Sequence, residues 1–332
     1  MGVPSEQLFT AQPNLKIIDC YESDFITDRS VEILASSCPQ LISASFINCQ
    51  NLQGHSLPTL VSACRNLKTL RMRGDTLRER PFQEIAWGET RLVELDFQDV
   101  PQISDTTLST MLLALRHLRY LRCPVTDTTL ARLRPGFPDL QVLKLRSATP
   151  ISRDTLAALL CACPNLEVLD ISAEPVGEEQ FAMFLPCLPN LMYINIAGDK
   201  DTVSSINLIQ QFCPLLQVLS IQFYCASNNS KLSNSLVEFI EKSPSVRKVL
   251  ISGVDIEPAI DETRSALERR LGTRRVDVIA DKWFEGMEVI PPMFSLDNIL
   301  KDTFQEYQVI SEKRLPGSMM TSVRRFLSQR RG

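Results

Sequence analysis

Histidine and glycine are both scarce in this chain, and their scarcity argues against most classes of enzyme. Only His55 and His117 occur in 332 residues, so the commonest general base and metal ligand is nearly absent. Twelve glycines leave little room for a glycine-rich phosphate loop, and neither a G-x-S-x-G nor an H-E-x-x-H motif occurs. We therefore expect no enzymatic activity, no cofactor and no metal site.

Long apolar runs and a strong excess of positive charge are also missing. No stretch approaches the roughly 18 apolar residues of a membrane-spanning helix, so none is expected. Residues 1–14 lack the basic and apolar segments of a secretory signal peptide. The net charge is −4 and the isoelectric point is about 5.5, which argues against nucleic acid as a partner.

The ten cysteines include no CxxC pair, which argues against a zinc site. Four of them recur just before a proline or a small loop, namely Cys38, Cys64, Cys163 and Cys213. Buried free cysteine behaves as a small apolar residue. We interpret these residues as reduced core thiols of an intracellular protein, cytoplasmic or nuclear or both. An extracellular disulfide framework is the alternative.

An internal repeat determines the expected architecture. The pattern L-x-x-L-x-L, with aliphatic or aromatic substitutes, begins ten times along the chain: at Leu15, Leu41, Leu67, Leu92, Leu118, Leu140, Leu166, Leu191, Leu216 and Val246. Successive units start about 26 residues apart. Each unit continues with a Thr or Ser suited to cap a helix, such as Thr27 or Ser104, and then with apolar residues at helical spacing. A Cys-Pro or Leu-Pro pair often ends that helix.

These units predict an α/β leucine-rich-repeat solenoid of about ten repeats. Its parallel strands would line a curved inner wall and its helices the outer wall, because no single unit can bury its apolar face alone. We expect an N-terminal lead-in at residues 1–13, the solenoid at 14–257, a capping segment at 258–290, and a partly helical or disordered tail at 291–332. Within the solenoid, residues 74–90 should form an irregular segment and residues 225–234 a mobile polar loop.

The helix starts of the form I-T/S-D-x-x-L and the C-P-x-L returns resemble the cysteine-containing repeats of F-box/leucine-rich-repeat proteins and of the antagonist-of-mitotic-exit type. The resemblance covers roughly residues 14–280. It implies a substrate receptor of a cullin–RING ubiquitin ligase. In that family an N-terminal F-box binds a Skp-type adaptor. Only 14 residues precede the first repeat here and no F-box is seen in them, so the resemblance extends to the repeat region alone.

A partner is expected on the concave sheet face, where alternate strand residues project. The candidate site residues are Arg71, Arg73, Asp96, Arg122, Lys144, Arg146, Tyr120 and Tyr193. Arginine forks suit carboxylates and phosphates, so one hypothesis is an acidic or phosphorylated protein segment. The alternative is a solvated sheet face on which Arg71, Asp96 and Arg122 pair across strands.

The sequence therefore favours a protein-binding module that recognises substrates for, or acts as adaptor of, an SCF-type ubiquitin ligase. The second hypothesis is a repeat scaffold with no link to a ligase.

Overall fold

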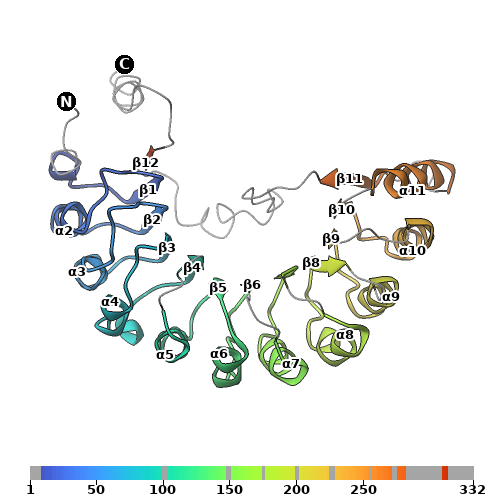
Figure 1. Ribbon diagram of the computed structural model, residues 1–332, viewed down its shortest axis with the longest axis horizontal. Helices are drawn as coiled ribbons and strands as arrows, with labels where there is room; N and C mark the ends of the chain where they lie inside the picture. Colours follow the sequence, from blue (N-terminus) through green and yellow to red (C-terminus); the bar gives the residue numbers. More distant parts are fainter. Residues whose placement is uncertain are drawn as a thin grey trace, which may run out of the picture. The chain divides into compact units, whose positions relative to one another are not determined.

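The computed structural model describes residues 9–98, 100, 103–146, 151–173, 176–198, 202–223, 229–253, 256–270, 275–281 and 309–312. These residues form two compact units. Unit 1 comprises Met1–Pro124 and Leu296–Gly332, and unit 2 comprises Val125–Ser295. Each unit repeats one pattern of strand, loop and helix (Figure 1).

Unit 1 holds the first five repeats. Its elements are β1 (Ile17–Tyr21), α2 (Asp28–Ser37), β2 (Ser43–Ile47), α3 (Leu57–Ala63), β3 (Thr69–Arg73), α4 (Glu79–Gln83), η1 (Trp87–Glu89), β4 (Glu94–Gln98), α5 (Asp105–Ala114), β5 (Tyr120–Pro124) and β12 (Val309–Glu312). The strands lie in the order β12-β1-β2-β3-β4-β5, and all neighbours are parallel.

Unit 2 continues the pattern. Its elements are α6 (Asp127–Arg132), β6 (Val142–Arg146), α7 (Arg153–Cys161), β7 (Val168–Ile171), α8 (Glu178–Phe184), η2 (Leu185–Cys187), β8 (Tyr193–Gly198), α9 (Thr202–Phe212), β9 (Val218–Phe223), α10 (Asn229–Lys242), β10 (Lys248–Ser252), α11 (Glu257–Arg270) and β11 (Asp277–Asp281). Strands β6 to β11 are parallel and follow chain order.

These arrangements confirm the predicted α/β leucine-rich-repeat solenoid. Each of the ten predicted units contributes one strand, from β1 to β10. Within each unit the helices line one side of the sheet, and the repeated leucines fill the space between sheet and helices (Figure 1). Leu70, Leu95, Leu143 and Leu169 occupy the same position in four repeats and are fully buried.

The recurring cysteines connect successive repeats as well as filling the core. The Cys64 thiol donates to the carbonyl of Cys38 at 3.6 Å, and the Cys38 thiol donates to that of Gln12 at 3.3 Å. Burial raises the pKa of Cys38 to about 11 and that of Cys64, with help from Cys38, to about 12. The prediction of reduced core thiols therefore holds for these residues.

Two other cysteines correct that prediction. Cys161 and Cys187 form a disulfide between the ends of α7 and η2 in unit 2. They lie outside the buried positions that the other cysteines occupy, which is why their thiols can meet across two repeats. Cys225 lies outside the described residues.

The helix caps follow the sequence closely. Thr27 caps α2 by accepting a hydrogen bond from Ser30 N at 3.2 Å, and Ser30 Oγ accepts one in return from Thr27 N at 2.8 Å. Ser104 and Thr126 cap α5 and α6 by accepting hydrogen bonds from Thr107 N and Thr129 N. Ser152 occupies the cap position of α7, but its hydroxyl makes no cap bond.

Acidic residues at helix starts also bind the next repeat. Asp28 accepts hydrogen bonds from Gln53 N and Ser56 N, each at 2.9 Å. Asp127 accepts one from Ser152 N at 2.8 Å. An acidic residue in the first turn of a helix also interacts favourably with the helix dipole. The structure shows that some of them bridge repeats.

The structure confirms one local prediction, the irregular segment at residues 74–90, and corrects another, the loop at residues 225–234. Residues 74–90 are irregular as predicted, with only the short elements α4 and η1. There Trp87 donates to the Phe82 carbonyl at 2.8 Å and packs against Phe97. By contrast, residues 229–234 belong to α10, so the predicted loop at 225–234 was wrong for this part.

The N-terminal edge of the sheet is covered from two parts of the chain. Phe9 is buried, and its carbonyl lies 3.7 Å from the Cys38 thiol. Strand β12 pairs with β1, with Ile17 opposite Val309. Apart from β12, the predicted tail at residues 291–332 lies outside the described residues.

Candidate protein-binding face

We call the sheet surface that points away from the helices the strand face. It is formed by the first, third and fifth residues of each strand. In β3 these are Thr69, Arg71 and Arg73, whereas Leu70 and Met72 point to the core and are fully buried. Because strands alternate their side chains, the same register places every predicted site residue on this face.

In unit 1 the strand face carries a charge network. Arg71, Asp96 and Arg122 are register partners on β3, β4 and β5. The Glu94 carboxylate accepts hydrogen bonds from Arg71 Nε at 2.7 Å and from Thr69 Oγ1 at 3.1 Å. Arg122 Nη1 lies 3.8 Å from Asp96 Oδ2. The predicted cross-strand pairing is therefore right for Arg122 and Asp96, but the close partner of Arg71 is Glu94.

Glu94 is the most buried charge of this network. Its side chain is 2% exposed, whereas that of Arg71 is 29% exposed. Burial raises the pKa of Glu94 to about 6, although Arg71 and the Thr69 hydroxyl oppose the rise. At neutral pH the carboxylate is ionised and compensates Arg71. In mildly acidic solution it takes up a proton, and the positive charge of Arg71 is then less compensated.

Arg73 lies at the fifth position of β3 with a partly exposed side chain. Its backbone carbonyl accepts a hydrogen bond from Asn48 N at 2.8 Å, which fixes the end of the strand. Its register partner on β4 is Gln98, so a glutamate at position 73 would not lie directly opposite Glu94 or Asp96.

The predicted tyrosines offer less surface than expected. Tyr120 is 1% exposed and Tyr193 is 7% exposed, although each is the first residue of a strand and belongs to the strand face. Tyr21 at the end of β1 is 43% exposed. Of these three rings, Tyr21 is the one with most area available to a partner.

In unit 2 the strand face has mixed polarity. Lys144 is buried and lies opposite Asp170 in the register of β6 and β7. Asp170 Oδ1 accepts hydrogen bonds from Ser172 Oγ at 2.8 Å and from Asn195 Nδ2 at 3.2 Å. Arg146 is exposed at the end of β6.

The structure thus divides the predicted site into two groups. Arg71, Arg73, Asp96, Tyr120 and Arg122 belong to unit 1, whereas Lys144, Arg146 and Tyr193 belong to unit 2. Sequence reasoning missed Glu94 and Thr69, the first residues of their strands. The signal was present, since each stands directly before a core leucine, at a position that also faces away from the helices.

The described part of the chain has neither a metal-type cluster of side chains nor a membrane-spanning helix. No three His, Cys, Asp or Glu side chains gather there as a metal site would require. No helix there combines the length and apolar character needed to cross a membrane.

Part of the repeat region is similar in sequence to known proteins. Residues 79–182 match the family model for the LRR repeats of the FBD-associated F-box protein At5g56370. This stretch of the chain is therefore similar to the leucine-rich repeats of an F-box protein. GRR1-like protein 1 of Arabidopsis thaliana is 27% identical over 139 residues, which make up 42% of this chain and 20% of that protein. The chain therefore spans about a fifth of this relative's length.

Solved structures of similar fold are more distant in sequence. The complex of Rad7 and Elc1 in yeast matches with a TM-score of 0.47 at 16% identity, over 76% of this chain and 79% of that one. The leucine-rich-repeat-containing protein LegL7 from Legionella pneumophila matches with a TM-score of 0.47 at 13% identity, over 85% and 88% of the two chains. Similarity at this level carries no information on function.

Proposed function

We propose that this leucine-rich-repeat module recognises substrates for an SCF-type ubiquitin ligase and binds them on its strand face. The ligase link rests on the F-box/LRR likeness of the repeats. A Skp-type adaptor and a cullin are the partners that such a role implies. We propose an intracellular location, which the buried thiols support.

The observation that carries the binding site is the charge network of unit 1. The strand-face positions of β3, β4 and β5 hold three arginines, Arg71, Arg73 and Arg122, and two carboxylates, Glu94 and Asp96, so the basic groups of these three strands exceed the acidic ones by one. An acidic or phosphorylated segment of a partner would complement this excess. Arginine is the residue best suited to do so, because its planar fork can bind a carboxylate or phosphate through two hydrogen bonds.

Reversing the charges of Arg71, Arg122 and Arg146 together is the direct test that the sequence suggests. The structure favours a milder variant, because a glutamate at position 71 or 122 would face Glu94 or Asp96. Arg73→Glu avoids both clashes of charge. Arg65→Glu is the matched control, since Arg65 is exposed just after α3 and lies outside the strand face.

Each variant would be purified from cells, and the co-purifying proteins identified by mass spectrometry. We expect the unchanged chain and Arg65→Glu to recover the same partners. Arg73→Glu should weaken capture of the strand-face partner by roughly tenfold, with an unchanged melting temperature. If Arg73→Glu retains every partner, the strand face of unit 1 is not the binding site.

The same purification separates the two candidate functions. Recovery of a Skp-type adaptor and a cullin with all three chains supports the ligase link, because those partners should not depend on Arg73. A stable partner recovered without either of them favours the alternative, a repeat scaffold with no ligase connection.

A further inference from the structure

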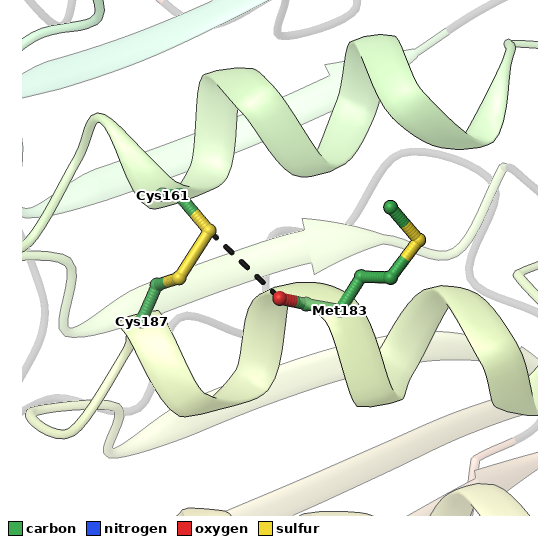
Figure 2. Close-up of a disulfide and its surroundings, with 3 residues drawn as sticks. All are labelled: Cys161, Met183 and Cys187. Atoms are coloured by element: carbon green, nitrogen blue, oxygen red, sulfur yellow. Dashed lines mark hydrogen bonds between the residues drawn. A yellow bond between two sulfur atoms is a disulfide. The ribbon is translucent and has the colours of Figure 1, made fainter.

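The disulfide between Cys161 and Cys187 joins consecutive repeats on the helix side of unit 2. Cys161 is the last residue of α7 and Cys187 the last of η2, with 5.0 Å between their Cα atoms. Figure 2 shows the bond running between the ends of these two elements. Cys161 is exposed and Cys187 is half-buried, so solutes can reach this bond.

The other described cysteines differ from this pair in accessibility. Cys20, Cys38, Cys49, Cys64, Cys123, Cys163 and Cys213 are all buried thiols. Cys163, only two residues from Cys161, is fully buried, and burial raises its pKa to about 11. A buried thiol that resists ionisation is a poor nucleophile, because the thiolate is the reactive form. Among the described cysteines, Cys161 and Cys187 are therefore the two whose sulfur atoms solutes can reach and react with.

The bridge occupies positions where the fold does not need cysteine. Relative to the return leucine of each repeat, Cys161 corresponds to Ser36 and Ser62, and Cys187 corresponds to Ala63. Helices α2 and α3 pack side by side with Ser36 and Ala63 at these positions. The bond thus adds a crosslink to a contact that the repeat already makes.

The reduced pair would also be well accommodated. Cys161 Sγ lies 3.9 Å from the Met183 carbonyl oxygen (Figure 2). Once the disulfide is opened and the two sulfurs separate, this oxygen is a nearby acceptor for a weak hydrogen bond from the Cys161 thiol. Both redox forms therefore fit the same backbone.

We infer that Cys161 and Cys187 form a reversible thiol–disulfide switch that responds to small disulfides of the glutathione class. In the oxidising direction one cysteine thiolate attacks the small disulfide, giving a mixed disulfide and releasing one small thiol. The second cysteine thiolate attacks the mixed disulfide, forms the Cys161–Cys187 bond and releases the second small thiol. Two protein thiols are oxidised and one small disulfide is reduced to two thiols.

The switch crosslinks the repeats that carry β7 and β8. These strands hold Asp170 and Asn195, which are hydrogen-bonded to each other on the strand face. The oxidised form therefore restrains local opening between α7 and α8, beneath that part of the strand face. The inference does not depend on the proposed ligase function, because it concerns the chemistry of the isolated chain.

Differential alkylation of the native chain tests the switch directly. The chain would be equilibrated with mixtures of reduced and oxidised glutathione, alkylated, and mapped by mass spectrometry. We expect Cys161 and Cys187 to pass together from fully alkylated to fully protected as the oxidised fraction rises. The seven buried thiols should stay unlabelled throughout. Failure of the bond to form in excess oxidised glutathione would overturn the inference, as would resistance to a large excess of the reduced form.

Thermal unfolding supplies the second readout. Opening the bond should lower the melting temperature by roughly 5–10 °C, because it frees a loop of 26 residues in the unfolded chain. Cys161→Ser copies Ser36 and Ser62 and should melt like the reduced chain under both conditions. Cys213→Ala, a buried control, should keep the redox-dependent difference. An equal melting temperature for the reduced and oxidised unchanged chain would show that the bond restrains nothing.

Discussion

Glu94 of β4 accepts a hydrogen bond from Arg71 Nε of β3 at 2.7 Å, yet burial raises the pKa of this carboxyl to about 6. The two effects act in opposite directions. The arginine stabilises the ionised form, and the loss of water around a nearly fully buried carboxylate destabilises it by more. The proposed binding face therefore contains a carboxyl group, that of Glu94, whose pKa is about 6.

Glu94 should give the chain a distinctive pH dependence. Its folded pKa lies above the unfolded value, so the folded state holds the proton more tightly. The stability from protonated Glu94 is fully present below about pH 4.5 and is lost as the pH rises to about 6. The shift corresponds to about 2 kcal/mol as an order of magnitude. Glu94→Gln should lack this loss when urea unfolding is measured between pH 4.5 and 7.

The difference between the two chains is the relevant quantity, because it isolates Glu94 from every other titrating group. The unchanged chain should lose stability relative to Glu94→Gln as the pH rises through this window. Parallel stability curves for the two chains would show that Glu94 does not titrate as its burial predicts.

The register of the sheet predicts a large effect at Leu143. This residue is the second of β6 and is fully buried. Leu143→Ala should lower the free energy of unfolding by roughly 2–5 kcal/mol, as truncation of a buried leucine does. Arg146→Ala in the same strand changes an exposed side chain and should stay within about 0.5 kcal/mol of the unchanged chain. Similar melting temperatures for both variants would mean that the strand faces are assigned the wrong way round.

Gly136 lies where two repeats of unit 2 approach closely. Its φ is +66°, and an added Cβ would lie 2.2 Å from Ala162 Cβ and 2.3 Å from the Ala162 carbonyl oxygen. Gly136→Ala thus combines a left-handed backbone with a clash against the end of α7. We expect a loss of more than about 2 kcal/mol in urea unfolding. Gly88→Ala is the control, since a Cβ there meets nothing within 4 Å.

The repeat predicted the fold because one pattern recurs ten times and every copy requires the same strand and helix. Caps such as Thr27 and Thr126 could be found in the same way, since capping needs only the residue and its place before an apolar helix. The period of the pattern also determines which strand residues point away from the helices, so the residues of the strand face could be predicted from the sequence.

The ion pairs within the strand face could not be predicted from the repeat pattern. Glu94 and Asp96 lie two residues apart on one strand, and either could compensate Arg71. The outcome depends on side-chain reach and burial, which a repeat pattern does not encode. The Cys161–Cys187 bond was missed for a related reason. Four of the ten cysteines occupy one recurring buried position, and Cys161 and Cys187 lie close to that position in their own repeats, so their pairing is not visible until the repeats are stacked.

Asp127 leads to the last prediction, which concerns contacts between repeats. Its carboxylate accepts the backbone N–H of Ser152, the cap residue of α7, and this bond is the main reason that its pKa is lowered. A lowered folded pKa contributes stability above the unfolded pKa of Asp, and this stability is lost as the pH falls through the folded value.

Asp127→Asn should therefore be less stable than the unchanged chain at pH 7. We expect a difference of roughly 0.5–1 kcal/mol, because solvent screens a partly exposed carboxylate. The deficit should begin to shrink as the pH falls below the unfolded pKa of Asp, and it should disappear below the lowered folded pKa of Asp127. Asp154→Asn removes the same charge from an exposed position in the first turn of α7 and serves as the control. If both variants lose equal stability at pH 7, the charge at the helix start matters and the bond to Ser152 does not.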